Sequence, residues 1–166
     1  MELHTKRLVL KPFCEGDEDA VLRIITNERV AKTFMVPEIR SAEEGRKVFD
    51  ALLKLSNTEG RCLLGIFLED ALAGFINDVD INGKSIELGW AMHPDFQGRG
   101  YATEAAEALI NKLFSEGFEE IRAGAFEGNE ASFRVMEKLG MRRISFEESI
   151  DYRGEKHRCI YYAIKK

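Results

Sequence analysis

The sequence predicts a mixed α/β fold: a central, mostly antiparallel twisted sheet with helices on both faces and one strand–helix–strand crossover. Three closely spaced apolar runs, the last two separated by Asn82-Gly83, indicate antiparallel strands, because Asn-Gly accepts the positive φ angles of a tight hairpin turn. From Gly100 to Glu116 the apolar residues recur at helical spacing, and another strand-like run follows at 121–126. Strand, helix and strand in that order predict the crossover.

The remaining elements follow from residues that start and stop regular structure. Asp17 is placed to cap a short helix, and Ser41 with Glu44 has the spacing of a capping box that opens a second helix. The segment 33–40 between these helices contains a proline and is expected to be a loop. The predicted strands lie near 8–10, 63–68, 71–76, 86–92, 121–126, 141–150 and 158–164, and the predicted helices at 17–25, 41–55, 100–116 and 129–139.

Composition narrows the class of protein. The 166 residues suit one domain, 1–166, and 45% hydrophobic with 32% charged residues is typical of a globular chain. The net charge of −5 is spread along the sequence, so a nucleic-acid binder with a basic stripe is not expected. No apolar run approaches a membrane span, and no signal peptide is evident. Three cysteines without metal-ligand spacing predict reduced thiols, no metal and a cytoplasmic protein: Cys14, Cys62 and Cys159.

The segment 97–102, Gln-Gly-Arg-Gly-Tyr-Ala, carries the strongest chemical signal, because it joins a strand to a long helix. Gly98 and Gly100 let the backbone approach a ligand and leave amide N–H groups free. The N-terminus of the following helix adds unsatisfied N–H groups and the positive end of its dipole, which together suit a pyrophosphate. The alternative is a tight turn that merely precedes a helix. The segment is neither a P-loop nor a dinucleotide fingerprint, since it lacks Gly-Lys-Ser/Thr and a third glycine.

Two motifs in this order resemble the GNAT superfamily of N-acetyltransferases. The first is Gln97-x-x-Gly100-x-Ala102, preceded by Glu-Leu-Gly-Trp at 87–90 and His-Pro at 93–94. The second is Asn129-x-x-Ser132, followed by Glu-Lys-Leu-Gly-Met at 137–141. The element order of the whole chain fits the same superfamily. The runs 5–10 and 100–105 are typical of the branch that contains the ribosomal-protein N-terminal (alanine/serine) acetyltransferases.

The resemblance implies acetyl-CoA as co-substrate, without a metal. Backbone amides of the glycine-rich loop are then expected to hold the pyrophosphate. Met92 is expected to offer backbone groups to the pantetheine arm, on a central strand that bulges and splays from its neighbour. Asn129 is expected to bind the pantetheine arm, or else to be only a helix N-cap. The residues expected to bind the cofactor are Met92, Gln97, Gly98, Arg99, Gly100, Tyr101, Ala102, Thr103, Asn129 and Ser132.

Transfer of an acetyl group to an amine requires a base, because a free alkylamine is mostly protonated at neutral pH. Glu87 is the candidate, since superfamily members often place a carboxylate at the start of the central strand to draw the proton through water. Its apolar surroundings favour a raised pKa. The alternative is that Glu87 is a structural carboxylate and that Asp78 or Asp80 binds the amine. His93 is a weaker candidate, more in keeping with a loop or hydrogen-bonding role.

The thiolate leaving group also needs a proton donor. Many relatives use a tyrosine in the helix after the asparagine, and the matching position here is Met136. Ser132 is the nearest replacement and a good hydrogen-bond donor to a thiolate. Because this tyrosine is missing, an alternative function remains open, in which the chain is a non-catalytic acyl-CoA-binding sensor or partner subunit.

The predicted function is therefore transfer of an acetyl group from acetyl-CoA to a primary amine by direct attack in a ternary complex. The amine is a protein N-terminus, a polyamine or another small amine, and the sequence does not choose among them. Selectivity is expected in the first two helices and in the loops 33–40 and 151–156. No nucleic acid or membrane partner is expected, and a homodimer is possible by analogy with the branch.

Overall fold

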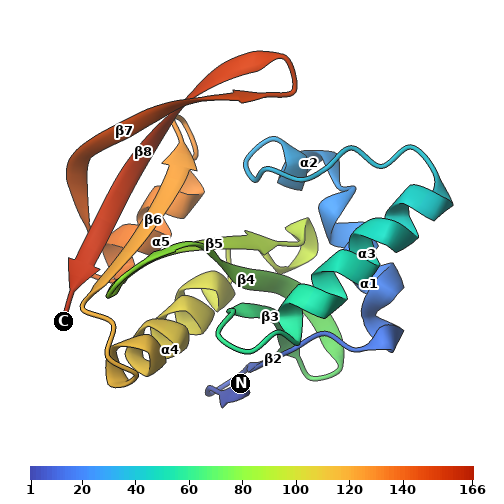
Figure 1. The fold of residues 1–166 in the computed structure, drawn as a ribbon, viewed down its shortest axis with the longest axis horizontal. Coiled ribbons are helices and arrows are strands. Elements are labelled where there is room, and N and C mark those ends of the chain that lie inside the picture. Colours follow the sequence, from blue (N-terminus) through green and yellow to red (C-terminus); the bar gives the residue numbers. More distant parts are fainter.

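In a computed structural model that describes residues 1–166, eight strands form one sheet in the order β1-β2-β3-β4-β5-β6-β8-β7 (Figure 1). All neighbouring strands are antiparallel except β5 and β6, which are parallel. The mixed α/β class and the single crossover are thereby confirmed. The strands are β1 (Leu3–His4), β2 (Val9–Lys11), β3 (Leu63–Leu68), β4 (Ala71–Asn82), β5 (Ser85–Met92), β6 (Glu120–Phe126), β7 (Arg142–Tyr152) and β8 (Glu155–Lys165).

Helices cover both faces of the sheet, as predicted. On one face α4 buries its apolar side against the central strands, and α5 packs on β6 and β8. On the other face α1, α2 and α3 enclose a second apolar cluster with β3 and β4. The helices are α1 (Glu18–Ile25), α2 (Glu28–Ala31), α3 (Ala42–Ser56), α4 (Tyr101–Ser115) and α5 (Glu130–Lys138), with short 3₁₀ turns η1 (Glu15–Asp17) and η2 (Pro94–Phe96).

Helix starts differ in detail from the sequence prediction. The Ser41 hydroxyl accepts a hydrogen bond from the Glu44 N–H at 3.1 Å, but the Glu44 carboxylate reaches the N–H of Arg40, so only half of the capping box forms. The Asp17 carboxylate does not cap α1 and instead accepts from the N–H of Cys14, closing η1. The short helix α2 was not predicted.

The two tight hairpin turns are found where the sequence places them. Gly83 in the β4–β5 turn has φ +59°, and in the β7–β8 turn Arg153 and Gly154 have φ +52° and +80°. In the β7–β8 turn both central residues have a positive φ, whereas in the β4–β5 turn Asn82 pairs with Ser85 as part of the strands and Gly83 alone has one. Both arrangements match the right-handed twist of the strands that such turns connect. Turn chemistry of this kind is local, which is why it could be predicted from sequence.

Strands β5 and β6 pair only over their first three residues, Ser85–Glu87 with Glu120–Arg122, and then separate. The splay expected from the resemblance is therefore confirmed. The expected bulge lies on the neighbouring strand instead. Asp78 pairs with Leu88 and Asp80 with Glu87, so the extra residue is Val79 of β4. A bulge re-aims the side chains beyond it, and here it brings Asp80 opposite Glu87.

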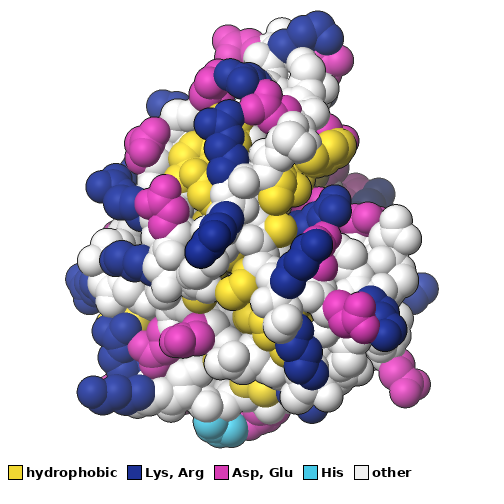
Figure 2. Space-filling view, turned by 90° about the vertical axis from the view of Figure 1, so that its left-hand side faces the viewer, with side chains coloured by type: hydrophobic (Ala, Val, Ile, Leu, Met, Phe, Trp, Pro, Cys, Tyr) yellow, Lys and Arg dark blue, Asp and Glu magenta, His cyan; other side chains and the backbone are white.

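Figure 2, a view from the side on which β7 lies in Figure 1, shows Lys and Arg beside Asp and Glu, with hydrophobic side chains between them. Neither sign dominates this face, in keeping with a net charge of −5 from 24 basic and 29 acidic residues. None of the helices has the length and apolarity that a bilayer crossing requires.

The helical layer over β3 and β4 depends on Phe49, whose side chain is fully buried in the apolar cluster of that face. Phe49→Ala should lower the free energy of unfolding by about 3–5 kcal/mol through lost burial and a residual cavity. Lys54→Ala, on the same helix but exposed, should change it by less than about 0.5 kcal/mol. Chemical denaturation of both variants tests this, and equal effects would contradict the assigned core.

Candidate active site

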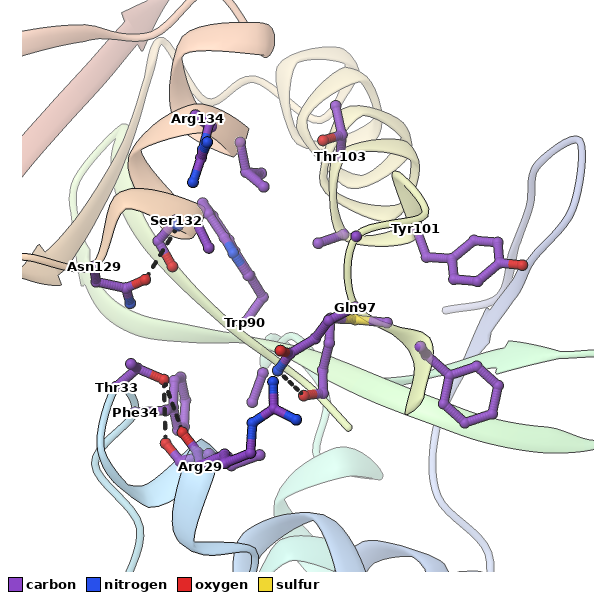
Figure 3. Close-up of a pocket in the computed structure, with 18 of the residues that line it drawn as sticks. Arg29, Thr33, Phe34, Trp90, Gln97, Tyr101, Thr103, Asn129, Ser132 and Arg134 are labelled. Atoms are coloured by element: carbon purple, nitrogen blue, oxygen red, sulfur yellow. Dashed lines mark hydrogen bonds between the residues drawn. The ribbon is translucent and has the colours of Figure 1, made fainter. Parts of the chain in front are cut away.

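The principal cavity opens where β5 and β6 have separated and has a volume of about 670 Å³. Its walls come from the end of β5, the loop 97–100, the first turn of α4, α5, and the segment from α2 to Phe34 (Figure 3). A small adjoining cavity is lined from both splayed strands, by Leu88 and Gly89 of β5 and by Gly124 and Ala125 of β6. The two cavities share Thr33, Phe34, Trp90, Asn129 and Ser132.

The loop that precedes α4 has the geometry of an anion site. Gly98 and Gly100 have φ +75° and +80°, a left-handed conformation that side chains disfavour. Gly100 is the N-cap of α4 and has no side chain to satisfy the free N–H groups of the first turn. Gly98, Gly100, Tyr101, Ala102 and Thr103 all line the cavity, so these free amides lie at its wall.

Gln97 and Arg99 each make a contact within the chain that the sequence did not predict. The Gln97 side chain donates from Nε2 to the carbonyl oxygen of Met92 at 2.9 Å, tying the loop to the end of β5. That carbonyl is one of the backbone groups expected to serve the pantetheine arm. Arg99 does not line the cavity, and its carbonyl accepts from Arg7 instead. In Figure 3 the Tyr101 ring points away from the cavity.

The start of α5 forms the opposite wall. The Asn129 Oδ1 accepts from the Ser132 N–H at 3.2 Å, so Asn129 is the N-cap, and its amide also lines the cavity. The Ser132 hydroxyl makes no hydrogen bond within the chain and lines both cavities. A half-buried hydroxyl without a protein partner, beside a helix N-terminus, is free to donate to a ligand.

Met136, which matches the position of the tyrosine in many relatives, lies in the core. It is 1% exposed and packs under α5 with Phe133 and Ala123, away from the cavity. Val135, one residue earlier, lines the cavity. A tyrosine at position 136 would therefore enter the core, and substitution there is not a way to restore a proton donor.

Basic side chains surround the principal cavity in an otherwise acidic protein. Arg29 and Lys32 come from α2 and its end, and Arg134 and Lys138 come from α5 on the other wall. No acidic side chain lines this cavity. A cleft lined by one sign of charge attracts ligands of the opposite sign, so the cavity suits a polyphosphate.

Glu87 lies at the point where the parallel pairing ends, on the face of β5 opposite α4. Burial raises the pKa of Glu87 to about 7, with further raising by Glu148 and Asp80 and opposition from Arg122. It does not line either cavity. Leu88 and Gly89, which line the small cavity, directly follow Glu87, whereas Trp90, the first residue of β5 that lines the principal cavity, is three residues further along, or about 10 Å at ~3.3 Å per residue. Proton transfer between Glu87 and the principal cavity therefore requires water.

Residues of the last two strands complete the surroundings of Glu87. The Tyr161 hydroxyl donates to the Glu148 carboxylate at 2.6 Å. The Tyr161 ring lies directly over Gly124, where a Cβ would come within 2.6 Å of it. Burial, together with the carboxylates of Glu148 and Glu87, raises the pKa of Tyr161, so its hydroxyl stays protonated. Glycine at position 124 is thus needed for the ring to cross β6.

Of the other polar residues considered for binding or deprotonating the amine, one lies beside Glu87 and two have structural roles. Asp80 pairs with Glu87 across the bulge and contributes to its raised pKa. Asp78 is 3% exposed, pairs with Arg61 at 2.6 Å and accepts from the N–H of Cys62, so it is structural and not an amine ligand. His93 is also buried, and its ring accepts from the N–H of Asp95 as the cap of η2.

The two loops expected to set selectivity are joined. The Tyr152 hydroxyl donates to the carbonyl of Ala31 at 2.9 Å and accepts from the N–H of Val36 at 3.4 Å. The end of the β7–β8 hairpin is thereby tethered to α2 and the segment after it, and both lie at the top of the molecule in Figure 1. Sequence reasoning did not single out Tyr152, Tyr161 or Glu148, because their partners lie on distant strands and no motif marks them.

Comparison with known proteins defines the class. Residues 7–142 match the family described as an acetyltransferase (GNAT) domain. YnaD of Bacillus subtilis (strain 168), named an uncharacterised N-acetyltransferase, is 34% identical over 164 residues, which is 98% of this chain and 95% of that protein. The chain therefore belongs to the GNAT acetyltransferase family and is an acetyl-CoA-dependent N-acetyltransferase.

Solved structures agree with this assignment. An acetyltransferase of the GNAT family from Bacillus anthracis superposes with a TM-score of 0.84 at 29% identity, covering 99% of this chain and 98% of that one. RimL, described as a ribosomal L7/L12 alpha-N-protein acetyltransferase and solved with coenzyme A, superposes with a TM-score of 0.87 at 20% identity, again over 99% and 98%. Because RimL is only 20% identical in sequence, its similarity to this chain shows a shared fold alone.

Gly100→Asp should abolish binding of acetyl-CoA, because a carboxylate at the N-cap of α4 repels phosphate and a side chain strains the left-handed backbone. Gly83→Asp is the matched control, since it also has a positive φ but lies in the β4–β5 turn with open space around it. Isothermal titration calorimetry of both folded variants is the measurement. Wild-type affinity in Gly100→Asp would place the cofactor elsewhere.

Proposed function

We propose that this enzyme acetylates a primary amine by direct attack in a ternary complex, with the cofactor in the slot between the splayed strands β5 and β6. The observation that carries the proposal is the meeting, in one cavity, of the glycine-rich loop at one wall and the unpartnered Ser132 hydroxyl at the other. The acceptor amine is proposed to approach from the opposite side, past Glu87 and between the tethered loops.

The residues present fit acetyl-CoA. Free amides of the first turn of α4 and the basic side chains of the cavity suit its phosphates. Asn129 retains its side-chain N–H₂ group for an amide of the pantetheine arm, because only its Oδ1 is used in the cap. Trp90, Ala91 and Phe34 give the slot an apolar lining for the rest of the arm.

Acetyl-CoA supplies an acetyl thioester, so the amine nitrogen bonds to the carbonyl carbon while the carbon–sulfur bond breaks. The ammonium group of the substrate loses one proton before it attacks, and the nitrogen loses a second as the amide forms, which balances the proton taken up by the leaving thiolate. The chain therefore has to accept the first proton and to stabilise the thiolate until it is protonated. Holding both reactants in one ternary complex also contributes to the rate, because orientation converts a bimolecular step into an intramolecular one.

Glu87 is proposed as the base, acting through water from its place at the end of the parallel pairing. A carboxyl with a pKa of about 7 is well matched to accept a proton near neutral pH. Glu148, Asp80 and Glu87 lie on the acceptor side of the sheet, and their charge favours a cationic amine over a neutral or anionic substrate. The amine is thereby attracted before it is deprotonated.

The α-amine of a protein N-terminus is the acceptor that we place first among primary amines. One relative, YdaF of Bacillus subtilis (strain 168), carries the name "putative ribosomal N-acetyltransferase", and RimL is described as a ribosomal L7/L12 alpha-N-protein acetyltransferase. Exposed apolar side chains on β4 and β7 offer contacts to residues that follow such an amine: Val79 and Phe146. A mass-shift screen with N-terminal peptides and polyamines distinguishes the two classes.

Glu87→Gln should lower kcat by about 10²-fold or more, with little effect on cofactor affinity. In the wild type the base is active when ionised, so kcat/KM should fall as the pH drops through about 7. Glu148→Gln removes one of the charges that raise this pKa and should move the acidic limb to lower pH. Glu107→Gln, an exposed carboxylate on α4, is the control. Full turnover by Glu87→Gln at neutral pH would make Glu87 structural.

Ser132→Ala should slow kcat by about 10²-fold, the size expected when one hydrogen-bond donor to a developing charge is lost. Cofactor affinity should stay close to that of the wild type, because the backbone N–H of residue 132 still reaches Asn129. Steady-state kinetics test this prediction, and Ser149→Ala, at an exposed serine of β7, is the control. An unchanged kcat in Ser132→Ala would show that water or the substrate protonates the thiolate.

A further inference from the structure

Arg7, in the turn between β1 and β2, makes four contacts with the start of α4. Its Nε donates to Glu104 Oε2 at 2.7 Å, and its Nη2 pairs with the same oxygen at 2.7 Å. Its Nη1 donates to the carbonyl of Arg99 at 3.1 Å. The guanidinium also lies over the Tyr101 ring, 4.5 Å from its centroid. One side chain from the N-terminus thus holds both the glycine-rich loop and the helix that follows it.

Glu104 is the partner that fixes Arg7 in this place. Its Oε1 accepts from the Thr5 hydroxyl at 2.7 Å and from the N–H of Arg7 at 2.9 Å. Burial raises the pKa of Glu104, but the hydrogen bonds from Thr5 and Arg7 outweigh it, so the pKa is lowered and the carboxylate stays ionised. The runs 5–10 and 100–105 of the sequence therefore meet in space.

The hydrogen bond from Arg7 to the Arg99 carbonyl sets the orientation of the peptide bond between Arg99 and Gly100. The chain has no cis peptide, and in a trans peptide the carbonyl and the following N–H point in opposite directions. Arg7 does not line the cavity, whereas Gly100 does. With the Arg99 carbonyl held by Arg7, the Gly100 N–H is therefore directed to the cavity side. The plane of this peptide turns about ψ of Arg99 and φ of Gly100, and glycine permits a wide range of φ, so the hydrogen bond to the Arg99 carbonyl restricts it.

We propose that Arg7 is a positioning residue for the cofactor, which holds the Arg99–Gly100 peptide so that the Gly100 N–H faces the pyrophosphate. The inference rests on the proposed place of the cofactor at this loop. Arg7 touches neither cavity, so it acts through the loop and not on the reacting atoms. A lysine cannot replace it, because only the planar guanidinium presents several donors in a fixed fork to Glu104 and to the carbonyl together.

The test compares two acetyl donors, acetyl-CoA and S-acetylpantetheine, which lacks the phosphates. In Arg7→Ala and Arg7→Lys the kcat/KM for acetyl-CoA should fall roughly 10- to 100-fold, as expected for loss of a hydrogen bond to a charged group. The loss should appear in KM, with kcat retained. The kcat/KM for S-acetylpantetheine should stay at the wild-type value in both variants. Lys6→Ala, which removes a neighbouring exposed cation that forms no ion pair or side-chain hydrogen bond, should match the wild type with both donors.

An equal loss with both donors would show a general structural role and overturn the inference, as would no loss in Arg7→Ala. Wild-type behaviour of Arg7→Lys would also overturn it, because charge alone would then suffice. Thermal unfolding of each variant identifies any that fail to fold, and Arg7→Lys keeps the charge that pairs with Glu104. The proposed function has a separate test in Gly100→Asp. Tight binding of acetyl-CoA by Gly100→Asp would refute the proposed site itself. If Gly100→Asp loses acetyl-CoA binding but Arg7→Ala behaves like the wild type, only the role of Arg7 is refuted.

Discussion

Backbone pairing between β5 and β6 stops after Glu87 and Arg122, and the rest of the site is arranged around that separation. Parallel strands normally continue to share hydrogen bonds, so their parting leaves backbone groups and side chains facing a slot. The crossover helix α4 begins just beyond the end of β5, which brings its free N–H groups to the same slot. α5 follows β6 and closes the other side. One topological feature thus brings both walls of the cavity together.

Charge is divided along β5. At its start Glu87, with Asp80 and Glu148 nearby, forms an acidic region, whereas the cavity at its end has basic side chains and no acidic ones. Such a division suits a reaction between a cationic amine and a polyphosphate-bearing donor, because each is attracted to a different end of one strand. The overall charge of −5 conceals this arrangement.

The sequence was sufficient for features that depend on neighbouring residues. The Asn82-Gly83 turn, the helical period after Gly100 and the glycine-rich loop are local, and each lies where it was predicted. Features set by contacts between distant residues were missed or wrong. The bulge lies on β4 and not on β5, the alternative amine ligand Asp78 is bound by Arg61, and the packing of Met136 in the core was not predicted. The same limit applies to contacts across 97 and 121 residues: Arg7 with Glu104, and Tyr152 with Ala31.

The central claim is that the cofactor occupies the slot between β5 and β6 with its phosphates on the loop before α4. Titration of ¹⁵N-labelled protein with coenzyme A, followed by amide chemical shifts, tests it most directly. The largest changes are predicted at the N–H groups of Gly98, Gly100, Ala102 and Ser132, which line the cavity. Amides of α1 and α3, on the other face of the sheet, should change little. Large changes confined to α1 and α3, with the loop unaffected, would contradict the account.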